Sequence, residues 1–346
     1  MKTMHSTPCL ALLLGFLLAG CSAETPTQAD ASTAPAEEAP EASPALPEGW
    51  RFVAGTEVPQ AESATPQLPA TVRSDDDVDV VVDDISRVIA GGDDVIAVME
   101  ALGLASSVYA APQRSATEAG RNAPKQFLFN RNTGAEGVLS LDATLFIGNS
   151  LRRHAQSGLA EKLRGAGLDA VVIDDLQPAP EKVRKIGATF GLPAQAEALA
   201  TQVEAQQARA QALGEAHARK PRVIHVSASG AGGRPTVGGT DNAASALIRL
   251  AGGINIGDEA GVANYSELSP EGVVASNPDV ILVSENDLAL FGGEEGLWKS
   301  YPTLKLTPAG QANRVWVMPD IQLKATSIAS GTGALALAEA LADIAQ

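Results

Sequence analysis

Short apolar runs alternate with amphipathic segments from about residue 86 to the C-terminus. The apolar runs have the length of single buried strands, at residues 87–90, 106–110, 143–147, 170–173, 222–226, 280–283 and 315–317. Segments with helical spacing of apolar residues lie between them, at residues 93–102, 134–141, 159–164, 242–250, 270–276 and 331–345. Strands that alternate with helices predict parallel α/β sheets covered by helices on both faces.

The alternation is interrupted once, near the middle of the chain. Pro180 and Glu181 open a helical run, and residues 193–218 then contain a single glycine and no further proline after Pro193. This composition predicts one long helix. The expected fold class is therefore α/β, with two Rossmann-like lobes joined by one long helix. The expected boundaries are 86–180 for the N-lobe, 181–220 for the linking region and 221–346 for the C-lobe.

A short internal similarity supports two equivalent lobes. Residues 134–148 read GAEGVLSLDATLFIG and residues 269–284 read SPEGVVASNPDVILVS. Glu136 and Glu271 hold the same place in both, at the start of a helix that precedes a strand. A match of this kind, once in each half, favours a structural repeat. A glutamate there is also favoured by the helix dipole alone.

The N-terminus has the pattern of an export signal. An apolar run at residues 10–19 is too short to span a bilayer, which takes roughly 20 residues, and it ends in small residues before Cys21. The tetrapeptide LAGC resembles the bacterial lipobox, which implies a signal peptide at 1–20 and a lipid on Cys21. The alternative is an ordinary secretory signal. Both cysteines, Cys9 and Cys21, lie in this segment, so residues 22–346 contain no thiol for a disulfide or a thiolate site.

Two segments separate Cys21 from the expected lobes. Residues 22–49 are almost all Ala, Pro, Glu, Ser and Thr, which predicts a disordered tether over 21–49. Residues 50–85 form an N-terminal extension, in which residues 71–82 are compatible with a small hairpin that turns at the three aspartates 75–77. These aspartates lack the ligand pattern of a calcium-binding EF-hand loop, so we expect a solvated acidic turn.

Charge and motifs exclude several classes of function. The net charge of −16 and the pI of about 4.7 exclude a nucleic-acid partner. No nucleophile elbow, phosphate-binding loop or zinc motif is present, which argues against an enzyme. The glycines at 230–239 predict a flexible loop between the lobes. We expect His217 to be solvated and His225 to be buried and hydrogen-bonded, whereas His154 follows a strand at the edge where ligands bind in parallel sheets.

Several longer segments resemble the substrate-binding proteins of haem ABC importers. They are LIRLAGGIN (247–255), NYSELSPEGVVASNPDVILV (264–283), LALFGGEEGLWKSYPTLKLTPAG (288–310), RVWVM (314–318) and, in the N-lobe, SRVIAGGDDVIAVMEALGL (86–104). The N-lobe segments alone are similar to the wider cobalamin, siderophore and haem group. The resemblance implies the class III substrate-binding protein fold and a monomeric, non-enzymatic protein. It also implies haem as a transported ligand without an intrinsic cofactor, and an ABC permease with its ATPase as partners.

The resemblance also implies roles for individual residues. Tyr265 matches a cleft tyrosine that ligates the haem iron in relatives. Where the family has Gly-Tyr-x-Arg in the N-lobe, this chain has Phe129 and Arg131, so one common iron ligand is missing here. Phe129 would stack on the porphyrin, and Arg131 would pair with a propionate. Arg152 and Arg153 are candidates for the same role, and His154 is a further candidate contact and a weaker iron ligand.

Further implications concern partners and location. Glu136 and Glu271 match the two glutamates that dock into arginine pockets of the permease. The lipid on Cys21 places the protein in the cell envelope, on the periplasmic or extracytoplasmic face, in a system for iron acquisition. Two alternatives stay open: a binder of cobalamin or a ferric siderophore with the same fold, and an envelope lipoprotein for interaction or signalling with a degenerate cleft.

Overall fold

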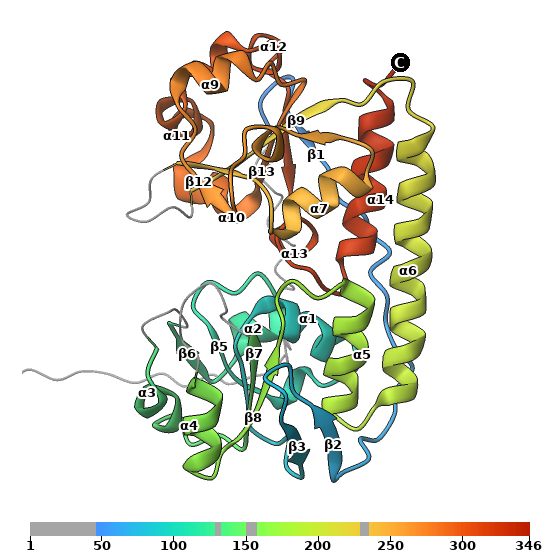
Figure 1. Ribbon diagram of the computed structural model, residues 1–346, viewed down its shortest axis with the longest axis vertical. Helices are drawn as coiled ribbons and strands as arrows, with labels where there is room; N and C mark the ends of the chain where they lie inside the picture. Colours follow the sequence, from blue (N-terminus) through green and yellow to red (C-terminus); the bar gives the residue numbers. More distant parts are fainter. Residues whose placement is uncertain (1–45, 129–132, 150–157, 229–234) are drawn as a thin grey trace, which may run out of the picture. The chain divides into compact units, whose positions relative to one another are not determined.

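A computed structural model describes residues 46–128, 133–149, 158–228 and 235–346. The predicted signal peptide, Cys21 and most of the predicted tether lie outside these residues. The described chain forms two α/β lobes. The long helix α6 (Pro193–Glu215) runs alongside both of them in Figure 1. The expected fold class is confirmed, whereas the predicted domain boundaries stay predictions.

The N-lobe is built on a parallel sheet in the order β6-β5-β4-β7-β8. Its strands are β4 (Val88–Ala90), β5 (Val108–Pro112), β6 (Lys125–Phe127), β7 (Leu145–Asn149) and β8 (Asp169–Ile173). Val88 and Ala90 pack into one apolar cluster and Ile89 into another, because successive side chains of a strand point to opposite faces. Helices cover both faces: α1 (Asp93–Ala101), α2 (Glu118–Asn122), α3 (Ala135–Leu139), α4 (Leu159–Gly165) and α5 (Ala179–Thr189).

The C-lobe sheet follows the order β1-β14-β13-β9-β10-β12, with β11 paired to β9. Its strands are β1 (Arg51–Phe52), β9 (Arg222–Ser227), β10 (Thr236–Gly238), β11 (Ile254–Asn255), β12 (Tyr265–Ser266), β13 (Val280–Ser284) and β14 (Val315–Met318). The prediction of an interlobe loop at 230–239 is therefore wrong for its last residues, which form β10. This strand pairs antiparallel with β9, and Thr236 and Val237 are buried there. Residues 229–234 lie outside the described residues.

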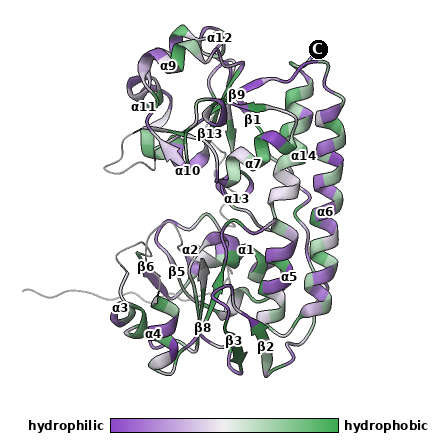
Figure 2. Ribbon diagram, in the orientation of Figure 1, coloured by the Kyte–Doolittle hydropathy of each residue, from purple (hydrophilic) through white to green (hydrophobic). Residues whose placement is uncertain are grey.

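Eight α-helices of the described C-lobe follow or flank these strands. They are α7 (Ala243–Leu250), α8 (Ile256–Glu259), α9 (Pro270–Ala275), α10 (Glu285–Phe291), α11 (Gly293–Ser300), α12 (Pro308–Gln311), α13 (Asp320–Leu323) and α14 (Ser330–Ala342). In Figure 2 the hydrophobic colour gathers on the strands, whereas α5 and α6 carry alternating hydrophilic and hydrophobic bands. This pattern is typical of helices that bury one face and expose the other.

Helix α6 connects the lobes as the sequence predicts and ends at Glu215, three residues before the expected end at 218. It packs along α14, as Figure 1 shows, and buries Leu199, Val203 and Ala210. Its one glycine, Gly214, lies against the backbone of Gly252, where an added Cβ would lie 2.6 Å from the Gly252 nitrogen. The glycine therefore permits close approach of two backbones. His217, predicted to be solvated, is half-buried, with Nε2 3.2 Å from the carbonyl oxygen of Ala338.

The N-terminal extension contacts both lobes. After β1 joins the C-lobe sheet, the carbonyl oxygen of Glu57 accepts hydrogen bonds from Gln206 on α6 at 2.7 Å and from Thr332 on α14 at 2.9 Å. The chain then forms an antiparallel hairpin against the N-lobe, of β2 (Ala70–Arg73) and β3 (Asp79–Val82). The segment therefore fastens to the lobes and to the helices between them.

The hairpin turn differs in one respect from the expected solvated acidic turn. Arg164 contacts the Asp76 carboxylate at 2.8 Å, and Lys185 pairs with Asp75. Two of the three aspartates are thus held by cations of the N-lobe. Among the described residues, no cluster of His, Cys, Asp and Glu is arranged to hold a metal ion. No helix in the described ranges has the length and apolar character to cross a bilayer.

Candidate functional site

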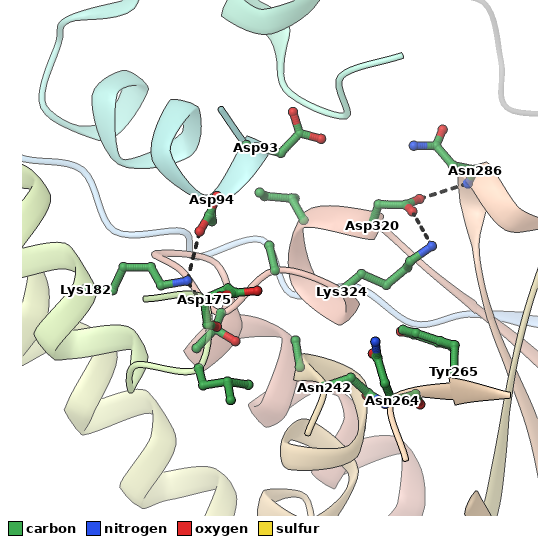
Figure 3. Close-up of a pocket in the computed structure, with 16 residues that line it drawn as sticks. Asp93, Asp94, Asp175, Lys182, Asn242, Asn264, Tyr265, Asn286, Asp320 and Lys324 are labelled. Carbon is green, nitrogen blue, oxygen red and sulfur yellow. Dashed lines mark hydrogen bonds and ion pairs between the residues drawn. The ribbon is translucent and has the colours of Figure 1, made fainter. Parts of the chain in front are cut away.

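A cavity of about 390 Å³ is lined by residues of both lobes. Figure 3 shows Asp93 and Asp94 at the start of α1 on one side, and Asn286 and Asp320 at the starts of the helices after β13 and β14 on the other. These positions are the carboxyl ends of parallel strands, where α/β sheets bind ligands. The polar residues that line the cavity are Asp93, Asp94, Asp175, Lys182, Asn242, Asn264, Tyr265, Asn286, Asp320, Lys324 and Thr326.

Tyr265 on β12 lies at the cavity and contacts a buried histidine on β9, two strands away in the same sheet. Its hydroxyl oxygen is 3.3 Å from Nε2 of His225, and the two rings meet edge to face with centroids 5.7 Å apart. The Nδ1 atom of His225 lies 3.2 Å from the carbonyl oxygen of Leu282 on β13. Because a carbonyl only accepts, Nδ1 carries the hydrogen and Nε2 is the acceptor for the hydroxyl of Tyr265. The expectation that His225 is buried and hydrogen-bonded is confirmed.

The sheet order explains this contact between residues that are 40 positions apart. Strand β10 lies between β9 and β12, and Gly238 on β10 is directly opposite Tyr265. A Cβ at Gly238 would lie 2.7 Å from Cδ2 of His225 and 3.1 Å from Cε1 of Tyr265. Only a residue without a side chain therefore leaves room for the two rings to meet.

The surroundings of His225 keep its imidazole neutral. Burial is the largest cause that lowers its pKa, to about 4, and nearby Lys324 lowers the pKa further, whereas Asp287 and the Leu282 carbonyl act in the opposite direction. The neutral ring retains a lone pair on Nε2 at neutral pH. This state agrees with the hydrogen bond from the Tyr265 hydroxyl.

Another cavity residue, Lys324, is partly exposed and forms an ion pair with the buried Asp287. The Lys324 ammonium lies 2.8 Å from Oδ2 of Asp287, whose side chain is fully buried in the first turn of α10. The hydroxyls of Ser227 and Ser284 also donate to this carboxylate, each at 3.0 Å. Burial raises the pKa of Asp287, but Lys324 and the donated hydrogen bonds outweigh it, so the pKa lies below its ordinary value. Lys324 itself lines the cavity and remains 21% exposed.

A second ion pair, with both side chains buried, lies on the N-lobe side. Lys182 on α5 is 1% exposed, and its ammonium lies 2.8 Å from Oδ2 of Asp94 in the first turn of α1. The ammonium also donates to the carbonyl oxygen of Asp175 at 3.4 Å. The hydroxyl of Ser327 in the C-lobe donates to the backbone carbonyl of Asp94 at 2.6 Å. The start of α1 is therefore fixed to both lobes.

Two further carboxylates give the described lining an acidic character. Burial is the main cause that raises the pKa of Asp93 and of Asp320 above the ordinary value. Asp320 accepts a hydrogen bond from the backbone nitrogen of Asn286 at 2.8 Å and lies 3.7 Å from Lys324. Of the two lysines that line the cavity in the described residues, Lys324 is therefore the one whose ammonium group is partly exposed.

Comparisons with known proteins agree with this architecture. The family model described as "Periplasmic binding protein" matches residues 88–321. The chain belongs to the periplasmic binding protein family. As a member, it is a binding protein rather than an enzyme, with an ABC permease as partner, and its relatives are periplasmic.

Solved structures of similar proteins carry more specific names. The periplasmic heme-binding protein RhuT from Roseiflexus sp. RS-1 is 32% identical, with a TM-score of 0.66, over 75% of this chain and 99% of that chain. The heme-binding protein HmuT is 25% identical, with a TM-score of 0.70, over 85% and 97%. BhuT, solved with two hemes, is 25% identical, with a TM-score of 0.63, over 75% and 99%. No curated protein sequence matches the chain.

The site residues expected from the sequence fall into two groups in this periplasmic binding protein. Tyr265 lines the cavity, as the family resemblance implies for a ligand contact. Five others lie outside the described residues: Phe129, Arg131, Arg152, Arg153 and His154. Sequence reasoning missed His225 as a partner of Tyr265, and it missed Lys182 and Lys324 as partners of buried aspartates. An apolar strand interrupted by one histidine was the available signal for His225.

The two glutamates of the internal similarity hold matching places. Glu136 on α3 and Glu271 on α9 are both exposed, and each precedes a buried valine by two positions. In each case a residue with positive φ follows six positions after the glutamate, Asp142 at 53° and Asn277 at 52°. Strands β7 and β13 then begin nine positions after Glu136 and Glu271. The predicted structural repeat is therefore confirmed for this helix–turn–strand unit. In Figure 1, α3 and α9 both lie on the side of the molecule away from α6.

Proposed function

We propose that this periplasmic binding protein captures haem between its lobes and delivers it to an ABC permease. The observation that carries the proposal is a tyrosine at the interlobe cavity, in a chain whose 32% identical structural relative is named a heme-binding protein. Ferric haem accepts a tyrosine oxygen as an axial ligand. In this proposal Tyr265 binds the iron, and haem is the transported ligand rather than a resident cofactor.

The rest of the haem needs apolar contact and cations for its two propionates. The described lining supplies Lys324 as a cation, while its aspartates disfavour an anion nearby. We therefore assign the propionates to Lys324 and to the arginines Arg131, Arg152 and Arg153, and ring stacking to Phe129. His154 is a further candidate contact. A guanidinium suits the two oxygens of a carboxylate.

Titration with hemin tests the proposal. Purified protein should shift the Soret band of hemin at a stoichiometry near one or two, and Tyr265→Phe should abolish the charge-transfer features of tyrosine ligation. Tyr109→Phe is the matched control, because Tyr109 is a half-buried tyrosine of the N-lobe sheet outside the cavity lining. Absence of any Soret shift in the unaltered protein would overturn haem capture. Thermal stabilisation by cobalamin or a ferric siderophore instead of hemin would assign the cavity to that ligand.

Delivery from the envelope requires two further features. We assign lipidation to Cys21, which would tether a monomeric binding domain near the permease. Cys21→Ala should move the protein from the membrane fraction to the soluble fraction while hemin binding is unchanged. Retention of the Cys21→Ala protein in the membrane fraction would contradict the anchor. We further assign permease docking to Glu136 and Glu271, which are exposed at matching positions of the two lobes.

A further inference from the structure

We infer that Leu176 is an apolar contact for the flat ring of the ligand, and that the hairpin of the N-terminal extension positions it at the cavity. This inference rests on the proposed haem function and deepens it. Phe129, the ring partner proposed from the sequence, lies outside the described residues, so the porphyrin has no apolar partner yet within them.

The exposure of Leu176 sets it apart from the other apolar residues of the cavity lining. Leu176 is 53% exposed. Ile321, the other large aliphatic residue of the described lining, is half-buried and packs against the apolar core of the N-lobe. Single exposed leucines are common on protein surfaces, but this one lies in a cavity that is otherwise mostly polar. A ligand with an apolar face gains affinity by covering it.

The loop that carries Leu176 has a fixed conformation at the carboxyl end of β8, where α/β sheets bind ligands. Oδ1 of Asp174 accepts a hydrogen bond from the backbone nitrogen of Leu176 at 3.0 Å, and the Asp174 carbonyl oxygen accepts one from Gln177 at 3.1 Å. The buried ammonium of Lys182 donates to the carbonyl oxygen of Asp175 at 3.4 Å. The residues on both sides of Leu176 are therefore held in place.

The hairpin β2–β3 supports the same loop from the N-terminal extension. Ser74 Oγ accepts a hydrogen bond from the Val172 nitrogen at 2.8 Å, and the Val172 carbonyl oxygen accepts one from the Asp75 nitrogen at 3.0 Å. Oδ2 of Asp75 accepts from the backbone nitrogen of Asp174 at 2.6 Å, while Oδ1 pairs with Lys185 on α5. In Figure 1 the hairpin lies beside β8. Asp75 is thus a positioning residue, which acts on the ligand through the loop of Leu176.

The two lobes then recognise different parts of the ligand. Tyr265 of the C-lobe and Leu176 of the N-lobe line the same cavity. In the proposed function Tyr265 binds the iron, whereas Leu176 contacts the ring. An apolar contact does not depend on the metal, so its contribution to affinity should be the same for a porphyrin without iron.

The test compares hemin with metal-free protoporphyrin IX, using the complete chain. Leu176→Ala should weaken the binding of both probes about tenfold, the value of covering roughly half of a leucine side chain. Tyr265→Phe should weaken hemin binding alone. Leu290→Ala is the matched control, because Leu290 on α10 is 51% exposed and lies outside the cavity lining. Absorbance titration measures hemin, and fluorescence titration measures protoporphyrin IX.

A double variant tests the role of the hairpin. Asp75→Ala should weaken the binding of both probes in the unaltered chain but change it little in the Leu176→Ala background, because its effect passes through Leu176. Asp79→Ala is the control, since Asp79 is an exposed hairpin aspartate that pairs with Arg73 of the same hairpin. Losses from Asp75→Ala and Leu176→Ala that multiply in the double variant would overturn the positioning role.

The remaining outcomes separate this inference from the proposed function. Unchanged affinities in Leu176→Ala, or a loss for hemin alone, would overturn the ring contact. Binding of hemin without any binding of protoporphyrin IX would overturn it as well, because the ring would then contribute no affinity of its own. If the unaltered protein binds no hemin, the proposed function fails. If it binds hemin and Leu176→Ala matches it for both probes, only the present inference fails.

Discussion

The two lobes place similar ion pairs at the cavity, but they expose them differently. In each lobe an aspartate in the first turn of the helix after a central strand, Asp94 or Asp287, binds a lysine at 2.8 Å. Both lysines line the cavity, but Lys182 in the N-lobe is 1% exposed, whereas Lys324 in the C-lobe is 21% exposed. The same pairing thus contributes to stability in one lobe and to the electrostatics of the ligand site in the other.

The largest expected effect is the loss of the sealed pair. Lys182→Met leaves the Asp94 carboxylate buried without its cation and should lower the free energy of unfolding by about 3–5 kcal/mol. Lys324→Met should lower it less, because Asp287 keeps the hydroxyls of Ser227 and Ser284 as donors. Urea denaturation of both variants measures the difference. Equal losses would show that exposure does not separate the two pairs.

A double variant identifies the cause of the loss. If the uncompensated Asp94 charge is responsible, Lys182→Met combined with Asp94→Leu should recover much of the lost stability. A double variant that is less stable than Lys182→Met would instead show that the pair itself is strongly favourable.

The next effect concerns the pH dependence of C-lobe stability. The folded-state pKa of His225 is lowered from 6.5 to about 4, so the unfolded chain binds its proton first as the pH falls. Stability from the neutral ring is complete above about pH 6.5 and is lost progressively toward pH 4, by about 3 kcal/mol at 1.4 kcal/mol per pH unit. The ligand-free His225→Gln variant should lose less stability over this window in urea denaturation at stepped pH. Parallel curves for the two proteins would contradict this assignment.

The sequence predicts best those features that local patterns determine. The helix–turn–strand unit after Glu136 and after Glu271 follows from apolar spacing within 15 residues, and the structure reproduces it in both lobes. Helix α6 is likewise visible in a composition that lacks helix breakers. The short strand β10 was not predicted, because its glycine-rich segment becomes a strand only by pairing with β9 and β12.

The site is less predictable because its contacts join distant positions. Tyr265 was reached through the family resemblance, since no local pattern marks it. Its contact with His225 spans 40 positions, and the contact between Lys182 and Asp94 spans 88. Such pairs depend on strand order and helix packing, which hydrophobic periodicity does not contain. A lysine within an amphipathic helix is ordinarily solvated, so the buried state of Lys182 had no signal in the sequence.

A smaller effect tests the electrostatic role of Lys324, the partly exposed lysine of the C-lobe pair. Because haem carries two propionates, Lys324→Met should weaken hemin binding about fivefold, the value of roughly 1 kcal/mol for a solvated charge pair. Asp320→Asn removes a negative charge 3.7 Å from Lys324 and should strengthen binding by a smaller factor. Both effects should shrink as salt increases. Titrations at low and high ionic strength measure them, and equal affinities for the variants and the unaltered protein would exclude Lys324 as a propionate contact.

The smallest expected effects compare the lobes at the permease. Glu136→Ala and Glu271→Ala should each reduce hemin uptake by at most about fivefold, because exposed ion pairs contribute up to about 1 kcal/mol. Hemin affinity should be unchanged, since neither residue lines the cavity. Glu118→Ala, an exposed helix-start glutamate of the N-lobe, is the matched control. If both lobes dock in the same way, the single variants should have similar effects, and the double variant should show their product. If only one of the two single variants reduces uptake, then only one lobe docks through this glutamate. The helix–turn–strand unit would then be shared by both lobes, whereas its docking role would not.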